Sequence, residues 1–98
     1  MTLPLSDYTV LDLSESVATA ACGRVFADFG ARVINVEHPV SGHPTRALLP
    51  FDPALSSPNN SSIHALLSPN KESLALDVRD TSQRAELLEW VKTADVVL

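Results

Sequence analysis

Two stretches of this chain alternate short apolar runs with helical patterns, and this alternation limits the fold more than any other feature. The stretches span residues 8–37 and 73–98. Apolar runs that alternate with amphipathic helices are typical of strands in a parallel sheet whose two faces are covered by helices. The pattern therefore predicts an α/β fold built on a doubly wound parallel sheet in three layers.

The first stretch has the length of one strand–helix–strand unit. Its two apolar runs are "YTVLDLS" at 8–14 and "ARVINVE" at 31–37. Ser14 or Ser16 is expected to cap the helix between them, and Gly30 to end it in the left-handed conformation. Four apolar residues at helical spacing are expected on the buried helix face: Cys22, Val25, Phe26 and Phe29. Because Cys22 belongs to this set, we expect it to fill the core and not to act as a reactive thiol.

The second stretch repeats the pattern with "SLALDV" at 73–78 and "DVVL" at 95–98. Asp80 followed by Gln83 is a variant of the capping box at the start of a helix. An apolar stripe follows on that helix: Leu87, Leu88, Val91 and Ala94. Two helices cannot cover both faces of four strands, so we expect a partial Rossmann-like sheet that is incomplete in this chain.

Residues 38–72 separate the two stretches and hold six of the seven prolines and all three histidines. Proline lacks the N–H donor that helix interiors and central strands need. We therefore expect a long extended connection with one short helix around 63–67.

Composition excludes several classes of partner. The 98 residues carry 7 basic and 12 acidic side chains, a formal net charge of -5, without the clustered Lys and Arg that nucleic-acid binding needs. No apolar run approaches the roughly 18 residues of a membrane span. The N-terminus lacks a signal-peptide pattern, and the single cysteine cannot form an internal disulfide. A cytoplasmic protein without nucleic-acid or membrane partners is expected.

Most motif-based chemistries are also absent. No G-x-G-x-x-G follows the first strand, and Glu37 at the end of the second strand is weak evidence for a ribose, so no NAD site is expected. His38, His43 and His64 are spaced by 5 and 21 residues, which matches no metal-ligand pattern. A serine nucleophile is not expected either, since there is no G-x-S-x-G.

Two features suit an anion. The helix start near Ser16 offers unpaired N–H groups, and Arg79 follows the third strand, where a cation could meet a phosphate. A solvated helix end and a surface arginine paired with nearby acids are the alternatives. Residue spacing alone thus predicts no more than the N-terminal part of an α/β nucleotide-type domain.

A series of motifs in fixed order goes further. They are "VLDLS" at 10–14, "FADFGARVINVEHP" at 26–39, "SGHPTR" at 41–46, "NKESLALDVRD" at 70–80 and "ADVVL" at 94–98. In this order they resemble the N-terminal region of the family III CoA-transferases (CaiB/BaiF type), which include formyl-CoA transferase and α-methylacyl-CoA racemase. The resemblance implies that residues 1–98 are the N-terminal part of a CoA-binding Rossmann-like domain.

The resemblance also implies coenzyme A or acyl-CoA as ligand, no metal, and a homodimer in the full-length protein. The residues that it places at the adenosine-phosphate end of CoA are Val17, Ala18, His38, Leu76, Asp77, Val78 and Arg79. His38 and Arg79 would meet the phosphates, and 76–79 would flank the adenine and ribose.

The chain departs from the family pattern at several positions. His38 stands where arginine is usual, Thr19-Ala20 where Gly-Pro is usual, and Glu72 reverses a charge expected beside the phosphates. The family's catalytic carboxylate, or the His and Asp pair of the racemases, lies beyond position 98, so no catalytic residue is expected here and the chain alone should not turn over.

Three hypotheses follow. The first is the N-terminal portion of an acyl-CoA:carboxylate CoA-transferase or acyl-CoA racemase that contributes to CoA binding. The second is a non-catalytic, degenerate module of this family that serves scaffolding or dimerisation. The third is an unrelated α/β binding domain, which leaves the ordered motifs unexplained.

Overall fold

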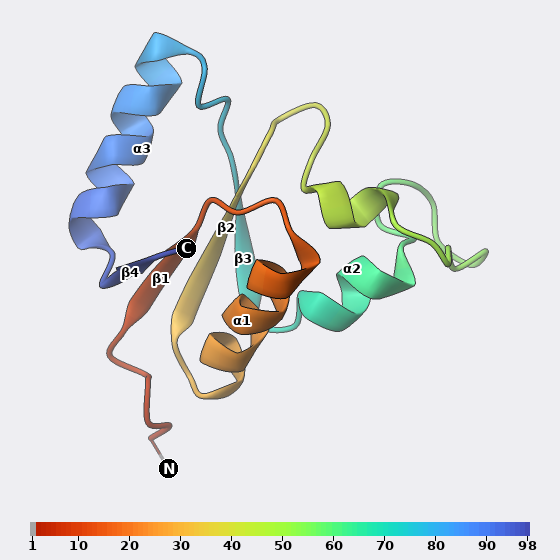
Figure 1. Ribbon diagram of the computed structural model, residues 1–98, viewed down its shortest axis with the longest axis horizontal. Coiled ribbons are helices and arrows are strands. Elements are labelled where there is room, and N and C mark those ends of the chain that lie inside the picture. The colour runs from red at the N-terminus through yellow and green to blue at the C-terminus, as the bar shows by residue number, and fades with distance from the viewer. Residues whose placement is uncertain (1) are drawn as a thin grey trace.

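The computed structural model describes residues 2–98, and over this range the chain forms a parallel sheet flanked by helices (Figure 1). The elements in chain order are β1 (Thr9–Asp12), α1 (Val17–Asp28), β2 (Arg32–Glu37), the 3₁₀ helix η1 (Pro44–Ala47), α2 (Ser62–Leu67), β3 (Lys71–Ala75), α3 (Thr81–Thr93) and β4 (Val96–Val97).

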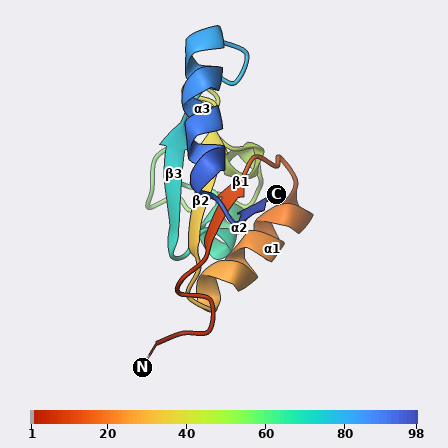
Figure 2. The ribbon, with the colours of Figure 1, turned by 90° about the vertical axis from the view of Figure 1, so that its left-hand side faces the viewer.

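The sheet has the strand order β3-β2-β1-β4, and every neighbouring pair is parallel. In Figure 1, α3 lies on the left of the strands while α1 and α2 lie to their right. Figure 2 is viewed from the side of α3, which lies in front of the strands. The order 3-2-1-4, with the chain moving outward from β1 and then crossing to its other side, is that of the first four strands of a Rossmann sheet. The predicted three-layer, doubly wound α/β fold is confirmed.

The core lies in two clusters, one on each face of the sheet. Val10 and Val33 point toward α1, and Leu11 and Ile34 point toward α3. All four are at most 2% exposed. Because side chains alternate along a strand, the continuous apolar runs of β1 and β2 supply both faces at once.

The buried face of α1 differs from the prediction. Its buried residues are Ala20, Gly23 and Ala27, whereas Cys22 is exposed and Val25 and Phe29 are 56% and 51% exposed. Of the four predicted residues, only Phe26 packs against the core. Small side chains on the buried face let the helix lie close to the strands, and a search for apolar periodicity gives such residues little weight.

The ends of α1 follow the prediction. The Ser16 hydroxyl accepts the backbone N–H of Thr19, which selects Ser16 over Ser14 as the cap. Gly30 has φ of 100° immediately after the helix. A Cβ there would lie 2.5 Å from the Cβ of Leu3, so this position requires glycine for space as well as for conformation.

The start of α3 corrects the predicted capping box. The Asp80 carboxylate does accept the backbone N–H groups at the helix start. Gln83 reaches past Asp80, however, and its Oε1 accepts the N–H of Asp77 at 2.8 Å. On the stripe of α3, Leu87 is buried and Leu88 is 56% exposed.

The connection 38–72 contains the predicted short helix as α2, and also η1, which the sequence pattern missed. Strand β3 begins at Lys71, two residues before the predicted run. Within residues 2–98 no helix has the length and apolar character that crossing a bilayer demands.

Candidate ligand-binding site

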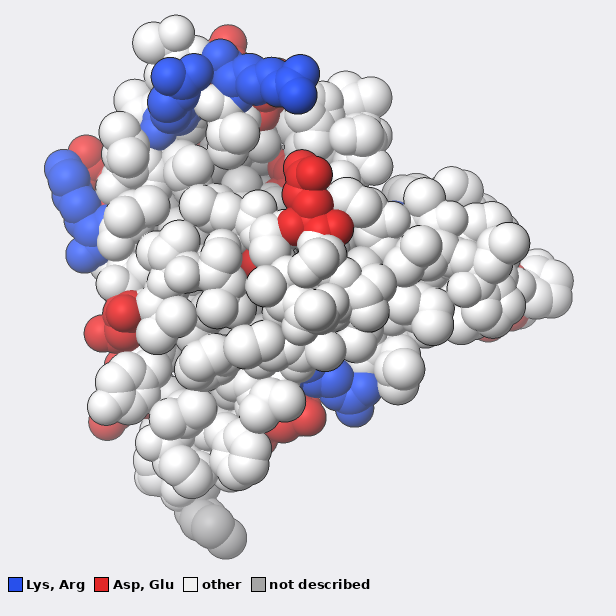
Figure 3. Space-filling model, in the orientation of Figure 1, with Lys and Arg blue, Asp and Glu red and all other residues white. Residues whose placement is uncertain are grey.

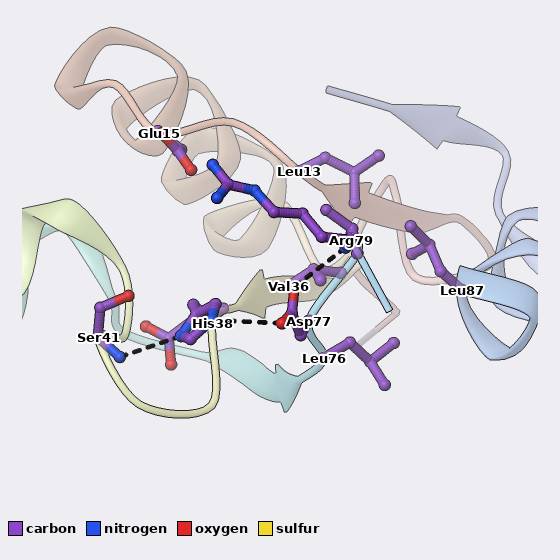
Figure 4. A pocket seen from close by; sticks show the side chains of 11 residues that line it. Leu13, Glu15, Val36, His38, Ser41, Leu76, Asp77, Arg79 and Leu87 are labelled. Carbon is purple, nitrogen blue, oxygen red and sulfur yellow. Dashed lines mark hydrogen bonds and ion pairs between the residues drawn. The ribbon is translucent and has the colours of Figure 1, made fainter. Parts of the chain in front are cut away.

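A pocket of about 400 Å³ lies where β1, β2 and β3 end, at the carboxyl edge of the sheet (Figure 4). It is lined by Leu13, Glu15, Val36, Glu37, His38, Ser41, Leu76, Asp77, Val78, Arg79 and Leu87. Ligands of open α/β sheets bind at this edge because successive loops diverge there and leave a crevice.

The structure brings five of the seven predicted site residues together in this pocket. These are His38 and the four residues at 76–79. Val17 and Ala18 lie in the first turn of α1 and do not line it. The pocket adds six residues: Leu13, Glu15, Val36, Glu37, Ser41 and Leu87. Of these, Leu13, Glu15 and Ser41 lie outside the helices and strands, so their orientation depends on how the loops fold. The sequence places these three residues close to the ends of β1 and β2. It does not show that their side chains line the pocket.

His38 is held in a defined tautomer. Its Nδ1 accepts the backbone N–H groups of Val40 and Ser41 at 3.1 and 3.2 Å, so the ring proton lies on Nε2. Nε2 lies 3.7 Å from the Oδ2 of Asp77. In this state His38 offers the pocket a neutral N–H donor in the place where the family pattern has arginine.

Arg79 is the cation of the pocket. Its backbone N–H donates to the Oδ1 of Asp77 at 3.0 Å, and Arg84 donates to the carbonyl of Val78 at 3.0 Å, which fixes the loop after β3. In Figure 4 the Arg79 side chain extends across the pocket toward Glu15. Over residues 2–98 its guanidinium forms no salt bridge, which leaves it available to an anion.

The charge around the pocket is uneven. Figure 3 shows basic side chains along the upper edge of the molecule, near the start of α3. Glu15 and Asp77 lie within the pocket itself. An anion would therefore be held at one side of the pocket, close to Arg79.

Glu37 lines the pocket, but its carboxylate already forms hydrogen bonds with other residues of the chain. Its carboxylate accepts two hydrogen bonds from Arg46, at 2.9 and 3.2 Å, and others from the Ser73 hydroxyl and the His43 N–H. Burial raises the pKa of Glu37, and the hydrogen bonds and charge of Arg46, with the Ser73 and His43 contacts, lower it more, so the net shift is downward. Glu37 is an ionised structural carboxylate, not a free ribose ligand.

A second buried carboxylate lies beneath α1. The Oδ1 of Asp12 accepts the N–H and hydroxyl of Ser14, while its Oδ2 is buried without a hydrogen-bond partner among the described residues. Lys71 approaches it beside Gly23, and its Nζ donates to the Ala20 carbonyl at 2.7 Å. Burial lowers the pKa of Lys71, and the charge of Asp12 opposes that shift. The hydrogen bond from Lys71 to Ala20 thus joins β3 to α1, close to the carboxylate at the end of β1.

Glu72 does not lie beside the pocket, contrary to expectation. It is on β3 close to its first residue, at the opposite end of the strand from the pocket, and its carboxylate pairs with Arg32 at 2.6 Å. The charge reversal at Glu72 therefore does not place a negative charge against a ligand in the pocket.

The three histidines do not gather at one place. His43 and His64 lie together with ring centroids 6.3 Å apart, whereas His38 lies in the pocket. Across residues 2–98 no group of three His, Cys, Asp or Glu side chains is arranged to hold a metal ion.

The sheet order and the pocket define a doubly wound α/β domain with a pocket at the carboxyl edge of its sheet. Residues 5–98 match the family model described as CoA-transferase family III, and the chain belongs to this family. It is 36% identical over 101 residues to a probable fatty acyl-CoA transferase of Mycobacterium tuberculosis, covering 97% of this chain and 23% of that protein. It is 34% identical over 99 residues to a formyl-CoA:oxalate CoA-transferase of Rhodopseudomonas palustris, covering 100% of this chain and 22% of that protein.

Solved structures agree with this assignment. A CAIB/BAIF family protein from Brucella suis superimposes with a TM-score of 0.86 at 29% identity, over 99% of this chain and 25% of that one. The Mycobacterium tuberculosis protein superimposes with a TM-score of 0.80 at 30% identity, over 97% of this chain and 24% of that one. The chain thus spans about a quarter of the length of the relatives that it matches.

Proposed function

We propose that this chain binds the adenosine-phosphate end of coenzyme A in the pocket at the carboxyl edge of its sheet. For the whole protein we propose transfer of CoA between an acyl-CoA and a carboxylate. The observation that carries the proposal is the pocket itself, which gathers His38, Leu76, Asp77 and Val78 with Arg79, whose guanidinium forms no salt bridge over residues 2–98.

The chemistry of the pocket fits a nucleotide. Leu13, Val36 and Leu76 provide apolar surface on which a base can lie, and Asp77 provides carboxylate oxygens that can accept ribose hydroxyls. Arg79 can pair with a phosphate through two N–H groups at once. No metal is needed in this arrangement, because arginine and N–H donors supply the contacts to the anion.

The names of the relatives support the reaction class. Those reported above are named as a fatty acyl-CoA transferase and a formyl-CoA:oxalate CoA-transferase.

The exposed apolar side chains of α1, Val25 and Phe29, support packing of this domain against a further part of the protein or against a second subunit. We therefore propose that the whole protein acts as a homodimer. We also propose, as the composition of the chain leads us to expect, that it acts in the cytoplasm.

A non-catalytic module of the same family is the second candidate, and His38 is the observation that favours it. A neutral imidazole beside Asp77 attracts a phosphate less strongly than an arginine in that place would. In this case the fold would be retained while the affinity for CoA would be lost.

Titration of the ¹⁵N-labelled chain with CoA separates the two candidates. We expect amide shifts at His38 and at 76–79, with smaller shifts at Val17 and Ala18. Pantetheine, which lacks the nucleotide, is the matched control and should leave these amides unmoved. An absence of any response at millimolar CoA would reject the CoA site and favour the non-catalytic module.

A further inference from the structure

His43 is buried and connects two segments that contribute residues to the pocket. It is 3% exposed and lies between β2 and η1. Its backbone N–H donates to Oε1 of Glu37 at 3.2 Å, and its Nε2 lies 3.0 Å from the carbonyl oxygen of Ser14 in the β1–α1 turn. A single side chain therefore bridges the segments that follow β1 and β2.

The direction of each hydrogen bond follows from the partners. The Ser14 carbonyl can only accept, so Nε2 of His43 carries the proton. Nδ1 then accepts, and the backbone N–H of Thr45 donates to it at 3.2 Å. The Thr45 hydroxyl, 2.8 Å from the same Nδ1, donates as well.

The Thr45 hydroxyl has one further partner, which extends the relay. Nδ1 of His64 lies 2.7 Å from the Thr45 oxygen, and because the hydroxyl proton is directed at His43, His64 must donate. Burial, followed by the positive charge of Arg46, lowers the pKa of His64, which favours the neutral ring. Hydrogen bonds thus run in one direction from His64 through Thr45 and His43 to Ser14.

Ser14 is consequently held from two sides. Its N–H and hydroxyl donate to Asp12 at 2.8 and 2.5 Å, and its carbonyl accepts from His43. The residues on either side of it, Leu13 and Glu15, line the pocket. The next residue, Ser16, caps α1.

We infer that His43 is a positioning residue for this pocket, which fixes the β1–α1 turn through the His64–Thr45–His43–Ser14 relay. The inference rests on the proposed function for its effect on CoA, but the relay itself is a property of the free chain. His43 does not line the pocket, so it acts on a ligand only through the turn that it holds.

Two substitutions separate the hydrogen bond to Ser14 from the cap that His43 provides to η1. Asparagine accepts from the Thr45 N–H as Nδ1 does, but its amide is too short to reach Ser14. Glutamine places an acceptor and a donor on either side of one carbon, as neutral imidazole does, and is expected to restore the contact. Ser61→Ala is the matched control, because Ser61 is also buried and its hydroxyl caps α2 without contacting the turn.

The first readout needs no ligand. His43→Asn should speed amide exchange of Ser14 about tenfold, because a buried hydrogen bond that holds the turn is lost. His43→Gln should leave that rate within about threefold of the wild-type rate. Ser61→Ala should speed exchange at His64, whose N–H it caps, and not at Ser14. An unchanged Ser14 rate in His43→Asn would overturn the inference whether or not CoA binds.

The second readout is affinity. The dissociation constant for CoA should rise about tenfold in His43→Asn and be restored by His43→Gln. An equal loss in Ser61→Ala would show a general structural effect and would overturn the positioning role. If the wild-type chain does not bind CoA while the exchange results hold, the proposed function fails and the relay stands.

A measurement on the wild-type chain avoids any question of folding. Long-range ¹H–¹⁵N spectra of the imidazole rings report which nitrogen carries the proton. We expect His43 protonated on Nε2 only and His64 protonated on Nδ1. The opposite tautomer at His43 would overturn the relay.

Discussion

The guanidinium of Arg46 and the carboxylate of Glu37 form a two-point ion pair, with Nε–Oε1 at 2.9 Å and Nη2–Oε2 at 3.2 Å. Glu37 ends β2 and Arg46 lies in η1, so the pair joins the sheet to the start of the long connection. The two side chains are 7% and 19% exposed. This burial makes the pair sensitive to the loss of either partner, because the remaining charge would have no solvent to replace the lost contact.

Arg46→Met should lower the free energy of unfolding by about 3 kcal/mol at neutral pH, because it leaves Glu37 charged and buried. Urea denaturation followed by circular dichroism measures the change. Arg32→Met is the matched control, since Arg32 pairs with Glu72 on the surface and its loss should have a much smaller effect. Equal effects of the two substitutions would contradict the argument from burial.

The same pair predicts a pH dependence. The pKa of Glu37 in the folded chain lies below its ordinary value of 4.5, so the unfolded chain binds the proton more readily. The stability that Glu37 contributes is therefore complete above the unfolded pKa and is lost as the pH falls through the folded pKa. Glu37→Gln should remove this part of the acid-side slope in urea denaturation measured from pH 7 downward. A slope identical to that of the wild type would mean that Glu37 is not the group responsible.

The fold could be predicted from the sequence because the patterns that specify its helices and strands are local. The apolar runs of β1 and β2 and the cap at Ser16 involve residues close together in the chain. The face of α1 was predicted wrongly, because the helix packs through Ala20 and Gly23 and periodicity counts large apolar side chains. Local sequence patterns predict which segments form helices and strands better than they predict which side chains pack closely between them.

The site was accessible only in part, for a different reason. Residues 76–79 were predicted from the resemblance to a family. That they line one pocket with His38 could be seen only in the folded structure. The partners of Glu37 are Arg46 and Ser73, and the charge near Asp12 is Lys71; these residues lie 9 to 59 positions away in the sequence and approach the two carboxylates only in the folded chain. A buried polar network of this kind leaves no spacing signature in the sequence.

Gly30→Ala should lower the free energy of unfolding by about 2 kcal/mol or more, because φ of 100° is strained for alanine and the new Cβ meets Leu3. Asn70→Ala is the matched control. Asn70 also has a positive φ, of 65°, but it is exposed and already carries a Cβ, so its replacement should cost less than about 1 kcal/mol. Denaturant unfolding of both variants measures the two losses in the free energy of unfolding. A smaller loss for Gly30→Ala than for Asn70→Ala would contradict this prediction.

Cys22 should react in the folded chain almost as fast as in the unfolded chain, because it lies exposed on the outer face of α1. Alkylation with iodoacetamide, followed by mass spectrometry with and without urea, measures the two rates. A cysteine at the buried position 20, Ala20→Cys in a Cys22→Ser background, should react at least about tenfold more slowly when folded. Protection of Cys22 itself would restore the original expectation that it fills the core.

Arg79→Met should raise the dissociation constant for CoA about tenfold, because a charge-assisted contact to a phosphate is lost at a partly solvated site. Isothermal titration calorimetry at two salt concentrations measures both the affinity and its ionic part. Lys92→Met removes the same charge from an exposed pair with Glu89 on α3, away from the pocket, and should change the affinity less than about twofold. Arg79→Lys should fall between them, since an ammonium keeps the charge but cannot make two parallel N–H contacts. If Lys92→Met weakened CoA as much as Arg79→Met, net charge alone would account for the affinity and Arg79 would not lie on a phosphate.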